Sequence, residues 1–229
     1  MIEPAEGADA HDVRVFLLGS VVGVLCHQRG LFALHASAVR LDGRAVMISG
    51  VSGAGKSTLS AALGQRGLPM VADDVVAIDC HAPGGAQVFP AFPVRKLTPD
   101  AMEELAIDPK GLVINRRGQP KYLVPALGGF DTMPLPLLAV YIIRRVRGRL
   151  PAGITGLEPA EAVAHLDQNI YRRGIGLKVT SPGSLFFTAS ALAGTVPVYL
   201  LGVREEDGLS SLGSLAETVE SHARTVASK

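Results

Sequence analysis

A glycine-rich segment, GVSGAGKS at residues 50–57, constrains the fold of this chain more than any other feature. It fits the Walker A pattern G-x-x-x-x-G-K-[ST], with an apolar strand-like run before it and a helical pattern after it. A phosphate-binding loop of this kind joins the carboxyl end of a strand to the first turn of a helix. The segment therefore predicts an α/β fold with residues 45–49 as a central strand and residues 57–65 as the helix that follows.

The loop also predicts a nucleotide site. Its glycines allow successive backbone N–H groups to point into one concavity, and the helix start adds the positive end of its dipole. We expect Lys56 to bridge the β- and γ-phosphates and the Ser57 hydroxyl to coordinate Mg²⁺, so ATP and Mg²⁺ are the predicted cofactors. The residues predicted to bind the nucleotide are Gly50, Val51, Ser52, Gly53, Ala54, Gly55, Lys56, Ser57 and Thr58.

Several classes of protein share this loop, including ATPases, GTPases, kinases and transport motors. An ABC-type ATPase is disfavoured because the sequence has no Leu-Ser-Gly-Gly-Gln-type signature and no apolar run closing with Asp-Glu far downstream. A GTPase is disfavoured because no Asn-Lys-x-Asp segment is present to read guanine. A kinase and a nucleotide-dependent sensor or binding module remain.

An acidic pair, Asp73 and Asp74, follows the strand-like residues 69–72 directly after the predicted helix. In a sheet of this kind, both carboxylates would stand beside the triphosphate crevice. One can hold Mg²⁺, and the other can accept a proton from an incoming hydroxyl. His35 lies in the apolar run 32–41, and a lone histidine in such a strand is more often a core residue than a catalytic one.

The remaining pattern predicts a mixed sheet in one domain. Asp42-Gly43 between two strand-like runs is a strong hairpin signal. The strands predicted at 69–72 and 88–94 leave too little chain for a parallel crossover. Further helices are predicted at 98–105, 159–172, 181–193 and 209–226, and strands at 137–143 and 197–203. We predict a single P-loop kinase domain over residues 1–229, with a frayed segment 1–11 and a nucleotide-binding core at 31–78.

The composition limits the kinds of partner that we expect this protein to bind. With 22 basic and 21 acidic residues, nothing indicates nucleic acid or an anionic membrane surface. Cys26 and Cys80 form no metal or disulfide pattern, which favours a cytoplasmic protein. We interpret the apolar run 13–26 as core structure because it is short for a membrane span and contains Arg14. The acidic N-terminus lacks the basic region of a secretory signal.

The order and spacing of His35, the loop 50–57, Gln65-Arg66-Gly67 and Val71-Ala72-Asp73-Asp74 resemble the catalytic domain of bacterial HPr kinase/phosphorylase. They resemble still more closely the smaller HPr-kinase-related proteins, some of which phosphorylate peptides in lasso-peptide biosynthesis. The resemblance is specific over 31–78 and looser at 17–20, 92–97 and 197–201.

This resemblance implies a P-loop kinase-like mixed sheet flanked by helices, and transfer from ATP to a serine or threonine hydroxyl of a peptide or small protein. It implies catalytic roles for Asp73, Asp74, His35 and Lys56. Asp73 would be the base, Asp74 would contact the metal or His35, and His35 would stand near the acidic pair. A small-molecule acceptor remains open.

The sequence also departs from the larger enzyme. The 229 residues are too few to include that enzyme's separate N-terminal domain. They contain neither its Glu-x-Arg-Gly-x-Gly signature nor its Pro-Gly-Arg-Asn loop, and RRGIG at 172–176 is only a faint echo. Phosphorylase activity, HPr as substrate and hexameric assembly are therefore not implied, and homo-oligomerisation stays open. Secondary candidates to contact the triphosphate or the acceptor are Arg95, Lys96, Lys121, Arg172 and Arg173, although solvated surface is the favoured interpretation for each. Arg144, Arg145, Arg147 and Arg149 form a basic cluster that could receive an acidic peptide, and they are interpreted as a solvated edge.

Overall fold

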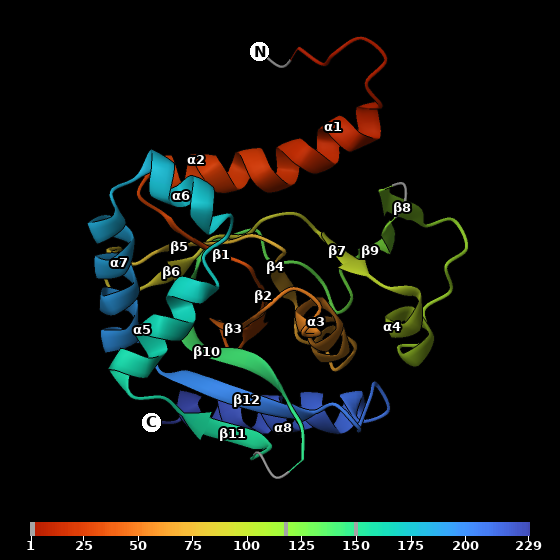
Figure 1. Ribbon diagram of the computed structural model, residues 1–229. Coiled ribbons are helices and arrows are strands. Elements are labelled where there is room, and N and C mark those ends of the chain that lie inside the picture. Colours follow the sequence, from red (N-terminus) through yellow and green to blue (C-terminus); the bar gives the residue numbers. More distant parts are fainter. Residues whose placement is uncertain (1–2, 117–118, 149–150) are drawn as a thin grey trace.

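The computed structural model describes residues 3–116, 119–148 and 151–229, and a mixed sheet of nine strands lies at its centre (Figure 1). Strand β3 (Arg44–Gly50) pairs in parallel with β10 (Leu135–Val146) and antiparallel with β2 (Ala36–Leu41). Strand β2 also pairs antiparallel with β4 (Met70–Asp73), so β3, β4 and β10 all run in one direction. The predicted mixed α/β architecture is confirmed.

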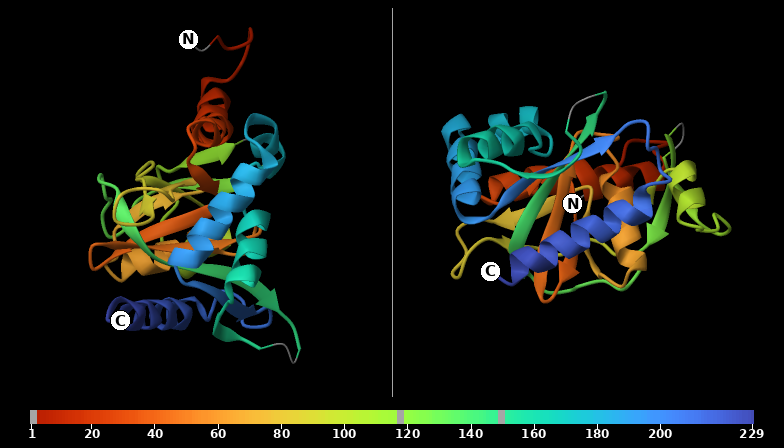
Figure 2. Two further views of the ribbon diagram at one scale, coloured as in Figure 1. Left: turned by 90° about the vertical axis from the view of Figure 1, so that its left-hand side faces the viewer. Right: turned by 90° about the horizontal axis from the view of Figure 1, so that it is seen from below.

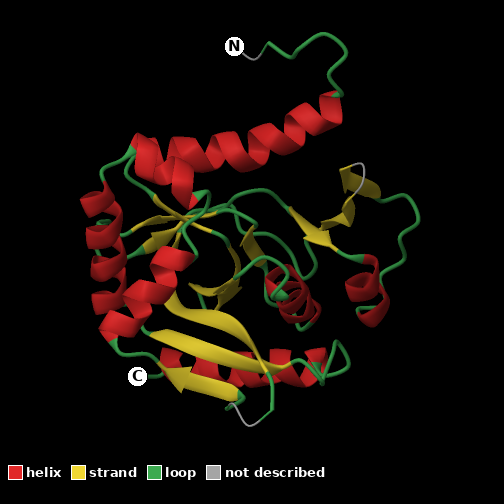
Figure 3. Ribbon diagram, viewed as in Figure 1, coloured by secondary structure: helices red, strands yellow, loops and turns green. Residues whose placement is uncertain are grey.

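Nine strands follow the order β1-β5-β6-β10-β3-β2-β4, with β12 beside β10 and β11 beside β12. The other strands of this sheet are β1 (Phe32–Leu34), β5 (Val76–Asp79), β6 (Gln87–Val88), β11 (Gly153–Gly156) and β12 (Val198–Arg204). A second sheet of three strands lies apart from it, next to α4 (Figure 3). Its strands, in spatial order, are β7 (Val94–Leu97), β9 (Gln119–Pro125) and β8 (Val113–Arg116).

Helices cover both faces of the main sheet. Along β10, Tyr141 and Ile143 belong to the hydrophobic core under α3 and α8, whereas Val140 and Ile142 belong to the core under α5 and α7. This alternation is the expected period of a strand buried on both faces. Figure 2, right, shows α8 lying across one face. The helices on these faces and around them are α3 (Lys56–Gln65), α4 (Pro99–Glu104), α5 (Pro159–Gln168), α6 (Arg173–Val179), α7 (Pro182–Thr195) and α8 (Leu212–Ala227).

Local signals predicted several turns and caps correctly. Asp42 (φ 48°) and Gly43 (φ 77°) form the turn between β2 and β3, and two positive φ values are typical of a type I′ hairpin. Gly67 follows α3 with φ 90°, as expected for a left-handed residue that ends a helix. The side chains of Thr98 and Ser181 cap α4 and α7.

The bounds predicted for three helices or strands were wrong. The run 32–41 is not one strand, because it bends at His35, whose amide donates to the Asn169 carbonyl (2.8 Å). The strand predicted at 88–94 is reduced to the two residues of β6, and Val94 instead starts the second sheet. The helix predicted at 159–172 ends at Gln168, and Arg172, with φ 49°, is the N-cap residue of α6 instead.

A continuous helical rod near the N-terminus is built from α1 (Ala10–Phe16), a π-helical turn η1 (Leu17–Val21) and α2 (Val22–Gln28). We call residues 10–28 the N-terminal rod. The described residues before it, 3–9, contain no helix or strand, and Met1 and Ile2 of the segment predicted to be frayed lie outside the described residues. By length and composition alone, the rod is long and apolar enough to cross a membrane. Core helices of soluble proteins and signal sequences share this property.

The interpretation of the run 13–26 as core structure was wrong. The rod crosses above the sheet from α6 to β8 (Figure 1), and only 28% of its most apolar window is buried. The buried face carries small and polar residues, and the large apolar side chains of Phe16 and Leu25 are 63% and 40% exposed. The rod is therefore a surface element whose large apolar side chains are partly exposed.

Close packing between α3 and the segment before β10 gives one stability prediction. A Cβ atom at Gly64 would lie 2.7 Å from the Leu127 carbonyl oxygen, whereas nothing lies within 4 Å of one at Gly213 in α8. Alanine favours a helix over glycine by about 1 kcal/mol. We expect Gly64→Ala nevertheless to destabilise the protein by about 1–3 kcal/mol through overpacking. Gly213→Ala, the control, should be neutral or stabilising in urea unfolding, and equal behaviour of the two variants would contradict this.

Candidate active site

A cavity of about 1350 Å³ opens at the edge of the sheet where β3, β4 and β10 end. Because these strands run in one direction, their carboxyl ends bring Gly50, Asp73 and Arg145 to the same edge. The N-terminal rod lines the side of the cavity opposite the sheet. Predicted site residues that line the cavity are His35, Gly50, Val51, Ser52, Gly53, Gly55, Lys56, Ser57, Thr58, Asp73 and Asp74.

The glycine-rich loop connects β3 to α3 as predicted. Gly50, Gly53 and Gly55 have φ values of 144°, 82° and 105°, a region in which L side chains are strained. A Cβ at Gly50 would lie 2.8 Å from the Ile143 carbonyl oxygen, so glycine is required there on steric grounds as well. Ala54 does not line the cavity, because its side chain is buried beneath the loop and only its backbone belongs to the turn.

Lys56 begins α3 and is only 6% exposed. Its Nζ donates to the carbonyl oxygens of Gly50 (2.8 Å) and Val51 (3.0 Å), which folds the side chain back over the loop. Burial lowers the pKa of Lys56 to about 8, although Asp73 and Asp74 oppose this change. A buried ammonium group with carbonyl partners gains strongly from an anion, and phosphate oxygens would supply one.

Asp73 lies against the loop. Its Oδ1 accepts from the Ser37 hydroxyl (2.5 Å), and its Oδ2 accepts from the Lys96 amide (3.2 Å). Burial raises the pKa of Asp73, whereas hydrogen bonds from Ser37 and from Ser57 lower it. Asp73 therefore stands beside Ser57, the hydroxyl that the sequence predicts for Mg²⁺.

Asp74 turns toward the other side of the cavity. Its φ of 71° is unusual for a residue with a side chain, and it lets β4 end and the chain turn into β5. Asp74 Oδ2 accepts from Lys96 Nζ (2.7 Å). Burial alone would raise the pKa of Asp74, but Lys96, His35 and Lys121 more than offset it, so the pKa is lowered and the carboxylate is charged at neutral pH.

His35 lies between β1 and β2, at the bend that the sequence did not predict. Its Nδ1 is 3.4 Å from Asp74 Oδ1 and 3.0 Å from the Asp74 backbone oxygen. Burial, followed by the charge of Lys56, lowers the pKa of His35, so the ring is neutral at pH 7. Because a carbonyl oxygen only accepts, Nδ1 carries the hydrogen and the neutral ring keeps its lone pair on Nε2.

The residues present fit a magnesium ion that arrives with a nucleotide. Over residues 3–116, 119–148 and 151–229, no group of three or more His, Cys, Asp or Glu side chains could hold a metal by itself. Mg²⁺ in nucleotide sites is usually bound by one or two side chains together with substrate phosphates and waters. The hydroxyl of Ser57 lies close enough to the carboxylate of Asp73 to lower its pKa, and the two groups supply hard oxygen ligands of this kind.

The predicted basic candidates separate into two groups. Lys96, Lys121 and Arg172 line the cavity, and the guanidinium of Arg172 lies 5.9 Å from the Tyr171 ring centroid. Arg173 instead pairs with Asp167 (3.0 Å) and does not line the cavity. For Arg95, the favoured interpretation as solvated surface was wrong: the side chain is fully buried in β7, since that strand turns it inward and Lys96 outward, and it does not line the cavity.

Sequence reasoning missed two residues at the site. Arg145 was grouped with a solvated edge, yet it lines the cavity, and its Nη2 would lie 3.4 Å from a Cβ at Gly55. The feature that could have identified Arg145 is its position at the carboxyl end of β10, the strand beside β3. Tyr171 also lines the cavity, with its ring centroid 6.0 Å from that of His35. No sequence signal identifies it, because it reaches the site from a distant part of the chain.

Comparisons with known proteins add one likeness. No protein-family model matches this sequence, and no curated protein matches it. Among solved structures, the chain is similar to the Hpr(Ser) kinase/phosphatase from Coxiella burnetii, with 16% sequence identity and a TM-score of 0.43. The alignment covers 86% of this chain and 99% of that chain. A likeness at this level concerns the fold alone.

Proposed function

We propose that this protein is an ATP-dependent, Mg²⁺-dependent kinase that transfers the γ-phosphate to a serine or threonine hydroxyl of a peptide or small protein. The observation that carries the proposal is that the phosphate-binding loop, except for the side chain of Ala54, and the paired acids Asp73 and Asp74 line one cavity. A sensor needs only the phosphate cradle, whereas a transferase also needs a group that can receive the proton of an alcohol. The resemblance of residues 31–78 to HPr-kinase catalytic domains supports the same activity.

The polar groups of the loop and of the acidic pair each have a role in this proposal. Lys56 and the loop amides hold the β- and γ-phosphates, and Ser57 with Asp73 would hold Mg²⁺, which neutralises charge on the transferred group. As the acceptor oxygen bonds to the γ-phosphorus, the bond from that phosphorus to the ADP oxygen breaks. The hydroxyl proton passes to Asp74, which Lys96 and His35 hold in place.

This assignment exchanges the roles that the resemblance implies for the two aspartates. Asp73 accepts hydrogen bonds from Ser37, Ser57 and the Lys96 amide, so its oxygens are directed toward the loop and the metal side. Asp74 contacts His35 and Lys96, on the side away from the loop. We therefore propose Asp74 as the proton acceptor and Asp73 as the metal partner.

The proposal is tested with γ-labelled ATP and a pool of unfolded serine- and threonine-containing peptides. We expect label on serine or threonine, dependent on Mg²⁺. Label that appears only as free phosphate would favour an ATPase or a sensor, and label on small alcohols but not on peptides would favour a small-molecule kinase. We further propose a cytoplasmic location, where ATP is available and the unpaired Cys26 and Cys80 would stay reduced.

The orientation of the nucleotide gives a second prediction. The acids lie at the end of β4 and Arg145 at the end of β10, on opposite sides of β3 in the order β10-β3-β2-β4. A γ-phosphate near the acids thus directs the α-phosphate and nucleoside toward Arg145. We expect Arg145→Ala to raise the KM for ATP by about 10-fold, the loss of a charge-assisted hydrogen bond.

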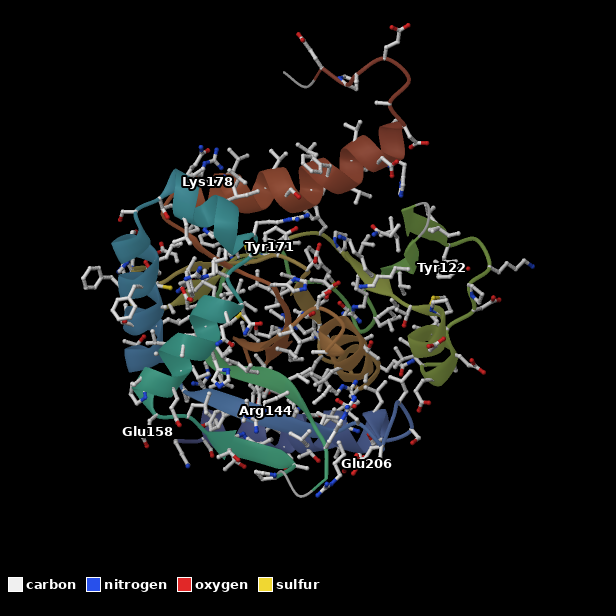
Figure 4. The ribbon with its side chains drawn as sticks, in the orientation of Figure 1. Tyr122, Arg144, Glu158, Tyr171, Lys178 and Glu206 are labelled. Atoms are coloured by element: carbon white, nitrogen blue, oxygen red, sulfur yellow. The ribbon has the colours of Figure 1, made fainter. Side chains whose placement is uncertain are left out.

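Its matched control is Arg144→Ala. Adjacent strand residues point to opposite faces, and Arg144 is exposed and does not line the cavity (Figure 4). Steady-state kinetics at saturating peptide separates the two variants. Equal KM values for ATP in both would remove Arg145 from the nucleotide site.

A further inference from the structure

The N-terminal rod is fixed to the protein on both sides of the active-site cavity. On the α2 side, the Tyr171 ring packs so tightly that a Cβ at Gly23 would lie 2.5 Å from it, and His27 Nε2 donates to the Tyr171 carbonyl (2.8 Å). On the α1 side, His11 Nε2 donates to the Asn115 carbonyl in β8 (2.6 Å). The rod is thus a bridge over the cavity, and Tyr171 lies beneath it in Figure 4.

The part of the rod between these anchors presents apolar side chains to the cavity. Val13, Leu17 and Val21 line it, and their spacing of four residues places them on one face of a helix. Phe16 lines it as well, although its side chain is 63% exposed. The opposite wall is charged and polar, with Lys56, Asp73, Asp74 and Lys96. Asp12, Gly19 and Ser20 of the rod also line the cavity, so the cavity has a reactive floor and a mainly apolar roof.

The roof lies on the acceptor side of the phosphate-binding loop. Its anchor Tyr171 is next to His35, and its other anchor, Asn115, belongs to the same small sheet as Lys96, which binds Asp74. The nucleoside is directed the other way, toward Arg145 at the end of β10. Since a triphosphate gains nothing from aliphatic side chains, the roof fits the group that carries the hydroxyl.

We propose that the N-terminal rod forms the acceptor site and that the acceptor is an extended peptide segment with an apolar side chain next to its serine or threonine. This inference rests on the proposed kinase activity. The cavity of about 1350 Å³ exceeds the 300–1,000 Å³ that is typical for small ligands, so a nucleotide and a peptide segment can share it. A rod anchored at both ends admits a flexible segment, whereas a broad folded surface would have to displace it.

The test uses two synthetic pools of ten-residue peptides with a central serine and γ-labelled ATP. In one pool the residues beside the serine are Leu, Ile, Val or Phe, and in the other they are Gly, Asn or Gln. We expect kcat/KM to be higher for the apolar pool by about 10-fold or more, which is the scale of discrimination by a hydrophobic pocket. Phe16→Ser should raise the KM for the apolar pool by about 10-fold.

The control is Leu25→Ser, on the same rod. Leu25 is 40% exposed but does not line the cavity, so this variant should retain the wild-type KM for the apolar pool. Equal labelling of both pools, or an equal loss in both variants, would overturn the acceptor site while leaving the kinase activity intact. So would a Phe16→Ser effect confined to the KM for ATP, or label only on folded proteins. Label only in free phosphate would overturn both the inference and the kinase activity.

Discussion

Replacing Lys56 with methionine is expected to abolish phosphoryl transfer and, at the same time, to stabilise the nucleotide-free protein. The loss of transfer follows because Lys56 is the charged group of the phosphate-binding loop. Removing one such electrostatic contact typically lowers kcat by about 10²–10³. Single-turnover transfer from labelled ATP measures the loss of transfer, and titration with a fluorescent ATP analogue measures the loss of nucleotide binding.

The gain in stability follows from the burial of the ammonium group. The pKa of Lys56 falls from 10.5 to about 8, a difference of about 2.5 pH units, or about 3 kcal/mol. Because the folded-state pKa is the lower one, the unfolded chain binds more protons between these values, and stability rises with pH there. The penalty is complete below about pH 8 and disappears above pH 10.5.

Methionine carries no charge, so the variant lacks this penalty. We expect Lys56→Met to be more stable than the wild type at pH 7, with the difference shrinking as the pH rises toward 10.5. Urea unfolding without nucleotide or metal measures it, and a less stable variant at pH 7 would contradict the prediction. Lys56→Arg, which keeps the charge, should show no such gain.

The second large effect separates the two aspartates. We expect Asp74→Asn to lower kcat by about 10²–10⁴, the usual contribution of a general base, with nucleotide binding retained. Asparagine tolerates a positive φ well, so the backbone at φ 71° should persist and the loss should be chemical. We expect Asp73→Asn instead to raise the Mg²⁺ concentration for half-maximal rate by about 10–100-fold.

Asp79→Asn is the matched control, because Asp79 ends β5, contacts the His81 amide and does not line the cavity. It should leave both the rate and the Mg²⁺ requirement unchanged. The opposite pattern, in which Asp73→Asn loses transfer at every Mg²⁺ concentration and Asp74→Asn only needs more Mg²⁺, would restore the assignment that the resemblance implies. Full activity of both variants would remove the acidic pair from the reaction.

Features set by neighbouring residues could be predicted from the sequence. The loop at 50–57, the turn at Asp42-Gly43 and the caps at Thr98 and Ser181 all depend on backbone preferences and hydrogen bonds within a few residues. The strand 137–143 was recognised because burial on both faces gives a continuous apolar run. These local signals predicted the mixed sheet, which the structure confirms, and a nucleotide site, which stays a prediction.

Other features depended on contacts between distant segments, and there the sequence failed. The break at His35 arises because β1 pairs with β5 while β2 pairs with β3, and no residue near 35 specifies either partner. The rod 10–28 has the composition of a buried helix, yet its small and polar face packs inward because Tyr171 occupies the surface at Gly19 and Gly23. Hydrophobic periodicity cannot reveal such an inverted arrangement.

The sequence by itself determined that the chain carries a Walker A pattern followed by paired acids, since both are written in consecutive residues. Only the tertiary structure decided which groups surround them. Lys96 at Asp74, Arg145 beside Gly55 and the apolar roof of the rod come from strand order and packing across the whole chain. The physical reason is that these contacts join segments far apart in sequence, and such contacts form only when the complete core has packed.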